Sequence, residues 1–384
     1  MQFLSLTWFA WLLATVSLYW LLPASVRQGF LIGVTAVFLG VHSPPSLVIL
    51  CVFTGLLHAV TRAAKPRAAA SSAVALAMLG TLVFFKLRVV SDSDNFITDT
   101  IIPLGLSYYT FRCLHFLFDR YRGSLPAMPL VELLAYLFFL PTIVVGPIHR
   151  APAFVRDHAS LRWSADNLSE GLERIVGGYF KIAVLGNFLV TAKLGEFLET
   201  VDPAHTFVIQ YVRMVRGGLN LYLQFSGFSD VAIGFALLLG YRVIENFRWP
   251  YLSTNIAEFW RRWHISLTSW SRDYVYMPLL GITRNPHVAT VASFVMIGLW
   301  HEISIRYLFW GLYHASGVIS WQAWQRRKRR YKLPVAKTPG TKALANGLAT
   351  LVTVHYVWLG FALIRQPDLA SAMTLLHDLF LPGR

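Results

Sequence analysis

The chain has 384 residues, of which 55% are hydrophobic and only 14% are charged, and its mean hydropathy is +0.52. An ordinary soluble domain carries about 25% charged residues, so the composition excludes a typical water-soluble globule. The formal net charge is +15, from 34 Lys and Arg against 19 Asp and Glu. Most basic residues lie in short segments between apolar runs, so we interpret this charge as that of membrane loops and not of a nucleic-acid interface.

Apolar segments recur along the whole chain, and about 20 such residues form a helix that crosses a hydrocarbon core of roughly 30 Å. The segments fall at 3–23, 29–41, 46–60, 72–90, 100–118, 130–146, 170–192, 206–240, 288–300, 304–324, 343–364 and 369–382. We expect an all-α, polytopic integral membrane protein with about ten transmembrane helices plus re-entrant or interfacial helices. No repeat or linker divides the chain, so residues 1–384 are treated as a single membrane domain.

The basic loops predict the orientation. Arg62, Lys65 and Arg67 flank one turn, and residues 326–332 form the strongest basic run, so both are expected to face the cytoplasm. The N-terminus, which we interpret as an anchored helix without a cleaved signal peptide, then lies outside, as does the acidic loop at 91–94. The run at 326–332 is explained by topology, with contact to anionic lipid as the alternative.

Several ionisable and thiol side chains lie inside apolar runs. A charged group there raises the free energy of the folded protein unless it faces the bundle interior. Helical spacing places Tyr108, Arg112, His115 and Asp119 on one stripe, which should avoid lipid and forms either a structural network or a substrate contact. The only two cysteines of the sequence, Cys51 and Cys113, are interpreted as small buried hydrophobes without a disulfide.

The segment 246–281 is rich in Trp, Tyr and Arg and carries too many charges to span a membrane. Asn255 followed by Glu258 has the spacing of a capping box, so a helix should begin at Asn255 and carry Glu258 and Arg262 as an i,i+4 pair. An amphipathic helix at the headgroup level would explain much of this composition. It does not explain the imidazole of His264 between two apolar residues.

A third polar position follows the apolar run that ends at His301. His301 and Glu302 begin like a zinc-protease motif, but Ile305 occupies the second histidine position, so the metal pair is absent. His301 and His314 are 13 residues apart, about 220° around an unbroken helix, and would not share a face. No nucleophile elbow or phosphate-binding glycine loop is present, so histidine acid/base chemistry is the catalysis that the sequence offers.

At these residues the sequence resembles the membrane-bound O-acyltransferase family, in its bacterial branch of alginate O-acetylation and teichoic acid D-alanylation proteins. The resemblance lies in PLGLSYYTF at 103–111, GPIHR at 146–150, the segment 246–280 with its core EFWRRWHISL, and GLWH at 298–301; YLQFSGFSD at 222–230 supports it. These stretches define a core at 100–320. The resemblance implies a ring of membrane helices around a thin central funnel, with a histidine in a tunnel that joins both sides.

The resemblance also implies roles for individual residues. His301 matches the catalytic histidine of the family and His264 the second polar position. Glu302 stands where the family usually has glycine, so a carboxylate beside the site is expected to raise the imidazole pKa or to alter the choice of acceptor. The candidate substrate-binding residues are Trp260, Arg261, Trp263, Arg272, Trp300 and Glu302.

The expected reaction is transfer of an acetyl group, or next a D-alanyl group, from a cytoplasmic thioester across the membrane to a hydroxyl of an exported polysaccharide or cell-wall polymer. The donor is acetyl-CoA or an acyl carrier protein, no cofactor or metal is expected, and the resemblance implies an extracytoplasmic transferase or polymer-binding partner. The location is the bacterial inner membrane, in contact with lipid. A transporter or flippase is the alternative, and it would predict inverted repeats that the sequence lacks. A scaffold that recruits another enzyme would leave His301 dispensable.

Overall fold

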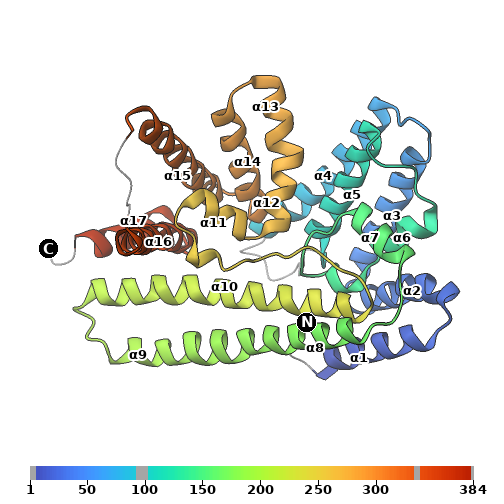
Figure 1. The fold of residues 1–384 in the computed structure, drawn as a ribbon, viewed down its shortest axis with the longest axis horizontal. Coiled ribbons are helices and arrows are strands. Elements are labelled where there is room, and N and C mark those ends of the chain that lie inside the picture. The colour runs from blue at the N-terminus through green and yellow to red at the C-terminus, as the bar shows by residue number, and fades with distance from the viewer. Residues whose placement is uncertain (1–5, 92–102, 333–337, 382–384) are drawn as a thin grey trace. The chain divides into compact units, whose positions relative to one another are not determined.

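The computed structural model describes residues 6–91, 103–332 and 338–381, and every regular element in these ranges is a helix (Figure 1). The elements are α1 (Leu6–Leu21), α2 (Ala24–His42), α3 (Pro44–Thr61), α4 (Ala68–Ser91), α5 (Leu106–Arg122), α6 (Leu130–Leu137), η2 (Leu140–Thr142), α7 (Ala151–Ala159), α8 (Ala165–Tyr179), η3 (Phe180–Lys193), α9 (Leu194–Thr200), α10 (Thr206–Leu238), η4 (Pro250–Leu252), α11 (Ile256–Arg262), α12 (Ile265–Ser271), η5 (Arg272–Tyr276), α13 (Met277–Thr283), α14 (Pro286–His301), α15 (Ile305–Arg330), α16 (Pro339–Ile364) and α17 (Leu369–Phe380). The all-α prediction is confirmed.

Several helices are long and apolar enough to cross a membrane. Among the described residues there are six, Ala24–His42, Pro44–Thr61, Ala68–Leu87, Ala165–Thr200, Thr206–Leu238 and Pro339–Ile364, and a shorter apolar helix covers Thr7–Leu21. An integral membrane protein is therefore supported, while the count of about ten crossings is not confirmed. The acidic loop at 91–94, on which part of the predicted orientation depends, lies mostly outside the described residues.

The apolar segment 130–146 is not one helix. α6 ends after eight residues, a single 3-10 turn η2 follows, and the chain then continues without regular structure to residue 150. Pro141 and Pro147 lack the N–H that a continuing helix needs, so the interruption follows from the sequence. Since the residues from Ala135 to Val144 are buried, this irregular backbone is enclosed by protein, as such backbone must be in a membrane.

The chain forms two compact units. Unit 1 comprises Met1–Tyr179 and Phe228–Glu245, and unit 2 comprises Phe180–Gly227 and Asn246–Arg384. The prediction of a single domain stays a prediction, since spatial clustering alone does not show whether the units fold separately. The interior of unit 1 contains large aromatic side chains, among them the completely buried Tyr19, Phe38, Tyr109, Tyr136 and Phe235.

The polar stripe on α5 faces the interior of unit 1, as the spacing predicts. Arg112 and His115 are completely buried. His115 Nε2 accepts from the backbone N–H of Ala151 at 3.2 Å, so Nδ1 carries the ring proton toward the Asp119 carboxylate at 3.0 Å. Arg112 donates to the carbonyl oxygen of Tyr136 over 3.3 Å. These bonds connect α5 to α6 and α7 and support the structural interpretation of the stripe.

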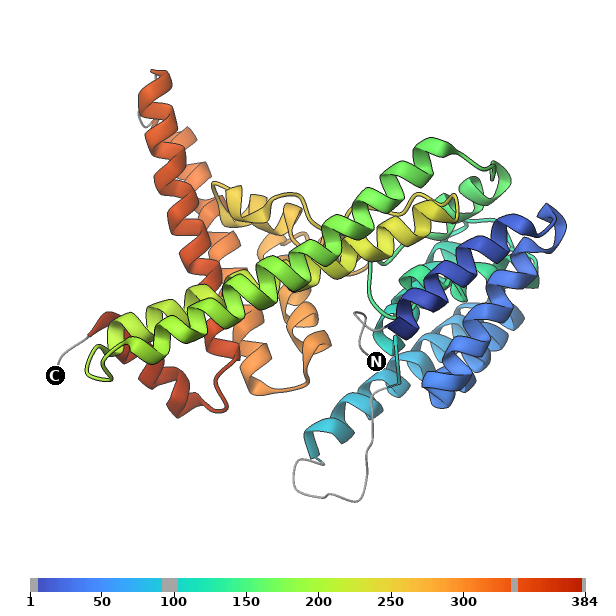
Figure 2. The same cartoon turned by 90° about the horizontal axis from the view of Figure 1, so that it is seen from below.

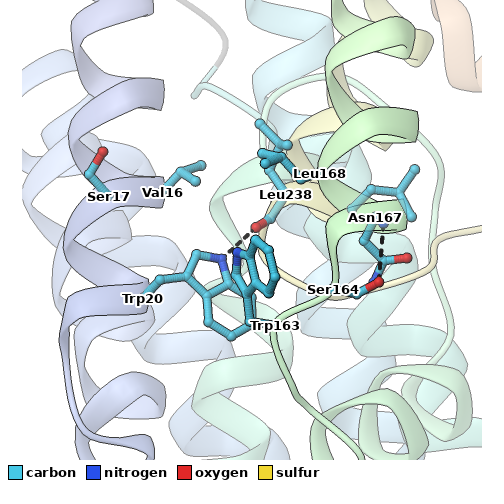
Figure 3. Close-up of a pocket in the computed structure, with 9 residues that line it drawn as sticks. Val16, Ser17, Trp20, Trp163, Ser164, Asn167, Leu168 and Leu238 are labelled. Carbon is cyan, nitrogen blue, oxygen red and sulfur yellow. Dashed lines mark hydrogen bonds between the residues drawn. The ribbon is translucent and has the colours of Figure 1, made fainter.

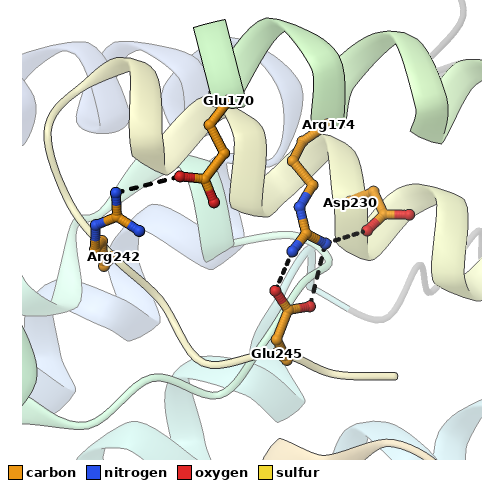
Figure 4. A network of polar contacts seen from close by, with 5 residues as sticks. All are labelled: Glu170, Arg174, Asp230, Arg242 and Glu245. Carbon is orange, nitrogen blue, oxygen red and sulfur yellow. Dashed lines mark hydrogen bonds and ion pairs between the residues drawn. The ribbon is translucent and has the colours of Figure 1, made fainter. Parts of the chain in front are cut away.

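An ion-pair network connects α8 to the end of α10 within unit 1 (Figure 4). Arg174 Nη1 donates to Asp230 Oδ1 at 2.9 Å and to Glu245 Oε2 at 3.2 Å, and Nη2 donates to the other oxygen of Glu245. Beside this group, Arg242 donates to Glu170 Oε2 at 3.2 Å. One guanidinium that holds two carboxylates fixes the chain where it leaves α10.

A cavity of about 130 Å³ in unit 1 lies between α1, α8 and α10 (Figure 3). The Trp20 indole N–H donates to the carbonyl oxygen of Leu238 at 2.7 Å, and Ser164 Oγ accepts from the N–H of Asn167 at 3.3 Å. The remaining lining includes Val16 and Leu168. None of the residues predicted as site residues lines this cavity.

In unit 2, η3 and the first part of α10 run side by side (Figures 1 and 2). Gln224 on α10 donates to Asn187 Oδ1 at 2.7 Å, and Arg216 donates to the carbonyl oxygen of Thr191 at 2.7 Å. Polar side chains that bond across neighbouring helices stabilise contacts in apolar surroundings, where packing alone gives little preference over lipid. The wide π-helical turns of η3 provide the carbonyl that Arg216 uses.

One sequence interpretation is wrong. Cys113 on α5 is completely buried, but Cys51 on α3 is exposed at the surface of the chain. A membrane helix is apolar on its lipid-facing side as well as on its inner side, so an apolar neighbourhood in the sequence did not indicate which side Cys51 occupies.

Candidate active site

The segment 246–281 folds as short helices with a break at its centre. Asn255 caps α11, and its Oδ1 accepts from the N–H of Glu258 at 2.8 Å, as the capping-box spacing predicts. The Glu258 carboxylate accepts from Thr254 N–H at 3.2 Å and from Arg262 at 2.5 Å. Burial alone would raise the pKa of Glu258, but these hydrogen bonds and the Arg262 charge outweigh it and lower the pKa. The predicted i,i+4 pair is confirmed, whereas a continuous amphipathic helix is not formed.

The break between α11 and α12 occurs at His264, which has a left-handed backbone with φ 45° and ψ 53°. This region is uncommon for residues other than glycine, and such strain persists only where the surroundings enforce it. The surroundings here are a neighbouring stretch of chain, since Ile265 N–H donates to the carbonyl oxygen of Asn246 at 2.9 Å and Arg248 N–H to that of Arg262 at 3.0 Å. The turn aims an imidazole into the interior of unit 2, where it is only 1% exposed.

The tautomer of His264 follows from its hydrogen bonds. Asn246 Oδ1 lies 3.3 Å from the backbone N–H of Ser266 and 2.9 Å from its hydroxyl. A backbone N–H can only donate, so the atom that it meets must be the amide oxygen and not the amide nitrogen. The same oxygen lies 3.0 Å from His264 Nδ1, which must therefore be the protonated ring nitrogen. Nε2 of the neutral ring is then an acceptor, and it has no hydrogen-bond partner among the described residues.

Aromatic rings surround His264. Phe225 meets it edge-on at 4.7 Å between centroids, and Trp300 lies 5.9 Å away. Burial, and next the charge of the neighbouring His301, lower the pKa of His264 well below its usual value. His264 is therefore neutral at physiological pH, with the bare Nε2 available to a hydroxyl proton.

His301 is positioned by the close approach of α14 and α15. A side chain at Gly298 would place its Cβ 2.2 Å from the carbonyl oxygen of Tyr307, and one at Gly311 would place it 2.6 Å from that of Phe294. Only glycine permits this backbone contact at both positions. The helix between His301 and His314, assumed unbroken in the sequence argument, is interrupted before Ile305, and both imidazoles contact the ring of Trp310, at 5.8 and 4.6 Å.

His301 is the last residue of α14 and is exposed. The ring of Trp300 lies 4.5 Å from it and that of Tyr307 5.8 Å, the latter nearly parallel at 27°. Trp300 contacts both His264 and His301, so these three predicted residues lie together in unit 2. Glu302 forms an ion pair with Arg306 at 3.0 Å, so its carboxylate is partly neutralised by this guanidinium.

Trp260 also contacts Trp310, with ring centroids 5.7 Å apart, and it contacts His314 at 5.0 Å. Trp260 is 4% exposed, and its indole N–H has no hydrogen-bond partner among the described residues. Both ring nitrogens of the buried His314 are likewise without one in the described part of the chain. A buried indole N–H and a buried imidazole can each bond to a water molecule or to a polar group of a substrate.

The remaining predicted substrate-binding residues differ in burial. Trp263 is 5% exposed and packs among Tyr222, Phe247, Tyr251 and Phe361, where it fills the interior of unit 2. Arg261 is exposed, and Arg272 is exposed with an ion pair to the adjacent Asp273 at 2.8 Å.

Sequence reasoning missed Asn246 as a site residue, although it marked the start of the matched segment. Its role requires a contact over 18 positions, which no helical spacing indicates. It also gave no role to Arg306. Three His, Cys, Asp or Glu side chains that could together hold a metal ion are found nowhere in residues 6–91, 103–332 and 338–381, and the expectation of a metal-free reaction stays a prediction.

Comparisons with known proteins identify the family. Residues 46–361 match the model of the MBOAT, membrane-bound O-acyltransferase family. The chain is 32% identical over 295 residues to a probable alginate O-acetylase AlgI of Pseudomonas aeruginosa, which covers 74% of this chain and 52% of that protein. It is 31% identical over 277 residues to the teichoic acid D-alanyltransferase of Bacillus subtilis, with 67% of each chain covered. It is 26% identical over 315 residues to a peptidoglycan O-acetyltransferase of Helicobacter pylori, with 73% and 57% covered.

The match to the alginate O-acetylases spans about half the length of those relatives, 52% in the example above. The family model nevertheless includes both histidines, the stripe on α5 and the α14–α15 pair. The resemblance expected from the motifs is confirmed, and it favours the acyltransferase interpretation over the transporter. The chain belongs to the membrane-bound O-acyltransferase family.

Proposed function

We propose that this protein is an O-acyltransferase that moves a small acyl group from a cytoplasmic thioester to a hydroxyl of an exported polysaccharide or cell-wall polymer. The observation that carries the proposal is the group of His264, Trp300 and His301 in a chain of this family. The named relatives act on alginate, teichoic acid and peptidoglycan, all of which are polymers of the cell exterior or wall. The hydroxyl acceptor lies outside the cell and the thioester donor inside it. The reaction centre must therefore be reachable from both faces of the membrane.

His301 is the proposed general base. It takes the hydroxyl proton as the acceptor oxygen attacks the thioester carbonyl, and it returns a proton to the thiolate when the C–S bond breaks. Imidazole suits this role because its pKa lies close to neutral pH. The exposed position of His301 at the end of α14 leaves it accessible to a substrate.

His264 is proposed to orient the acceptor hydroxyl. Its bare Nε2 can accept a hydrogen bond but cannot donate one, because Asn246 holds the proton on Nδ1. This tautomer favours the Trp260 indole N–H, or backbone amides, over His264 as the donor to the developing oxyanion. A water-poor passage lined by these aromatic rings would protect the thioester from hydrolysis.

The donor is proposed to be acetyl-CoA, with a D-alanyl carrier-protein thioester as the second choice; the acetylating relatives include the alginate O-acetylases and the peptidoglycan enzyme. We further propose about ten crossings around a central funnel in the bacterial inner membrane, with the N-terminus outside. The run at 326–332 would then face the cytoplasm, and an extracytoplasmic transferase or polymer-binding partner would receive the acyl group. Aromatic side chains flank this run, with Lys328 lying 5.6 Å over Trp324, which is typical of a membrane interface.

The experiment uses the purified protein in lipid vesicles with radiolabelled acetyl-CoA and, in parallel, a D-alanyl carrier-protein thioester. Wild type should consume one donor and His301→Ala should consume neither, with less than a few per cent of the wild-type rate. His205→Ala is the matched control, because His205 is an exposed imidazole on the loop between α9 and α10. It should retain full activity.

The result is interpretable only if the variants insert and fold alike, so their melting temperatures are compared. A folded His301→Ala protein that keeps substantial turnover would overturn the assignment of the base. An extracytoplasmic extract is added as a source of partner and acceptor. If folded wild type then consumes neither thioester donor, the acyltransferase proposal is contradicted.

A further inference from the structure

The cavity between α1, α8 and α10 of unit 1 takes no part in the proposed reaction, since none of the candidate site residues lines it (Figure 3). Its volume is about 130 Å³, and Val16, Leu168 and Leu237 contribute apolar side chains to its lining. An apolar cavity of roughly 150 Å³ in another protein holds a benzene molecule. The cavity of this chain is therefore large enough for several methylene groups of an acyl chain.

Several polar groups of the cavity wall already have hydrogen-bond partners within the protein. The Trp20 indole N–H donates to the carbonyl oxygen of Leu238 at 2.7 Å. The backbone N–H of Asn167 donates to Ser164 Oγ at 3.3 Å, and Asn167 Oδ1 accepts from Arg242 at 2.9 Å. Because these groups are satisfied, they do not require ordered water inside the cavity. An apolar occupant therefore suits the space between them.

The rim of the cavity is apolar and exposed. Trp163 and Leu168 line the cavity, and 59% and 39% of these side chains are exposed. Leu18 and Leu21, which neighbour the lining residues along α1, are 49% and 80% exposed. In an integral membrane protein such side chains contact lipid, and Trp is enriched where the hydrocarbon meets the headgroups. The cavity therefore adjoins lipid and not bulk water alone.

A guanidinium without a carboxylate partner lies against one of the lining rings. Arg27 Cζ is 4.7 Å from the centroid of the Trp20 ring, which is a cation–π contact. Arg27 Nε donates to the carbonyl oxygen of Leu22 at 3.0 Å, and Nη2 donates to that of Trp20 at 3.4 Å. Arg27 forms no ion pair, and its Nη1 no hydrogen bond, within the ranges that the structure describes. The N–H groups of Nη1 can therefore donate to an anion.

The membrane face of Arg27 follows from α2 and α3. These consecutive candidate spans are joined at Ser43, so the first turn of α2, which holds Arg27, faces the same side as the end of α3. The end of α3 is followed by Arg62, Lys65 and Arg67, the basic loop that is predicted to face the cytoplasm. Arg27 would then lie at the cytoplasmic leaflet, whose negative surface potential attracts basic side chains.

We propose that this cavity and Arg27 form a binding site for one anionic phospholipid, with part of an acyl chain in the cavity and the phosphate on the Arg27 guanidinium. The planar fork of an arginine matches two oxygens of a phosphate. The lipid would contact α1, α8 and α10 together, so its binding would stabilise unit 1. The site goes beyond the proposed function and does not depend on it.

The headgroup contact is tested by native mass spectrometry of the full chain in detergent. Phosphatidylglycerol and phosphatidylcholine with identical acyl chains are supplied at equal concentration. Wild type should bind phosphatidylglycerol about fivefold more tightly, the scale of one basic residue at an anionic surface. Arg27→Gln should remove this preference. Arg62→Gln is the matched control, because Arg62 is an exposed arginine of the same unit on the same predicted face, and it should leave the preference unchanged.

The acyl-chain contact is tested with a ring that fills the cavity. Ser17 lines the cavity, so Ser17→Phe should weaken the binding of both phospholipids. Gly55→Phe is the control, because nothing lies within 4 Å of a Cβ added at this exposed position, and it should change neither. Melting temperatures of the same samples show whether the variants fold. Wild type should melt higher with phosphatidylglycerol than with phosphatidylcholine, and Arg27→Gln should melt alike with both.

Several outcomes would overturn the proposal. One is equal binding of the two phospholipids by folded wild type. Another is an equal effect of Arg62→Gln, which would indicate diffuse attraction by net charge. Unchanged lipid binding by folded Ser17→Phe would place the acyl chain outside the cavity. Inorganic phosphate is added to a parallel sample, and full displacement of phosphatidylglycerol by millimolar phosphate would show that Arg27 binds a free anion and not a lipid.

Discussion

Asn246 Oδ1 accepts a hydrogen bond from His264 Nδ1 at 3.0 Å, across 18 positions of the chain. The same oxygen accepts from both the backbone and the hydroxyl of Ser266. One amide therefore fixes the tautomer of the imidazole and holds the first turn of α12, so the chemistry of the site and its local fold depend on a single side chain.

Replacing Asn246 by leucine should damage both functions of this amide. The Nδ1–H of His264 would be left buried without an acceptor, which costs about 1–3 kcal/mol, and the ring would be free to change tautomer. We expect a lower melting temperature and a turnover reduced by about two orders of magnitude, the scale of a lost orienting group. Thermal melting in detergent and label transfer measure the two effects.

Ser266→Ala serves as the comparison, because it removes one donor to Asn246 and leaves the imidazole bond intact. It should lower the melting temperature slightly and leave most of the turnover. If Ser266→Ala inactivates the enzyme as strongly as Asn246→Leu, the amide acts through α12 and not through the tautomer of His264.

The sequence predicted local contacts well. The cap at Asn255 and the Glu258–Arg262 pair each depend on spacings of three or four residues, which a helix imposes wherever it forms. The contact between Asn246 and His264 depends instead on a left-handed turn that joins α11 to α12. No periodicity encodes such a turn, so motif resemblance could mark the segment but could not supply its geometry.

The same distinction explains the errors. Cys51 was placed inside because a helix that is apolar on all sides gives no indication of which face meets lipid. The segment 130–146 has the composition of a crossing, yet Pro141 and Pro147 interrupt it and its backbone is enclosed in unit 1. Sequence patterns identified polar and interrupting residues within apolar segments. The burial of these residues depends on tertiary contacts, which the patterns do not encode.

The helix cap at Asn255 provides a quantitative test of the local structure. Asn255→Ala removes the acceptor for the Glu258 N–H at the start of α11, and such a change typically costs about 1 kcal/mol. We expect a small fall in the melting temperature with little change in turnover, since Asn255 contacts neither His264 nor His301. Asn255→Ser should restore most of the loss because serine also caps helices. A large loss of turnover without destabilisation would mean that α11 contributes directly to the site.

Acid should destabilise the protein partly through His264. Burial, with the charge of His301, lowers the pKa of His264 in the folded chain, whereas in the unfolded chain its pKa is about 6.5. Below pH 6.5 the unfolded state therefore binds a proton that the folded state does not, and the free energy of unfolding decreases as the pH falls. The decrease reaches at most about 1.4 kcal/mol per pH unit for one group and continues until the folded pKa is reached.

Melting temperatures between pH 7.5 and 5 measure this effect. His264→Asn should melt with a shallower dependence on pH than wild type, because the substituted side chain does not titrate. His205→Asn, which removes an exposed imidazole, should leave the slope unchanged. Identical slopes for wild type and His264→Asn would show that His264 is not kept neutral by the fold.

The approach of α14 to α15 gives the most demanding structural prediction. A side chain at Gly298 would place its Cβ 2.2 Å from the carbonyl oxygen of Tyr307, and backbone cannot yield as a flexible side chain can. Gly298→Leu must therefore push the helices apart and move Tyr307 relative to His301, whose rings now stack at 5.8 Å. We expect destabilisation of several kcal/mol, as for severe overpacking, together with loss of transfer. Gly281→Leu is the matched control, because nothing lies within 4 Å of a Cβ added there, and it should be nearly silent. Full activity of Gly298→Leu would mean that the close helix contact is not needed to position His301.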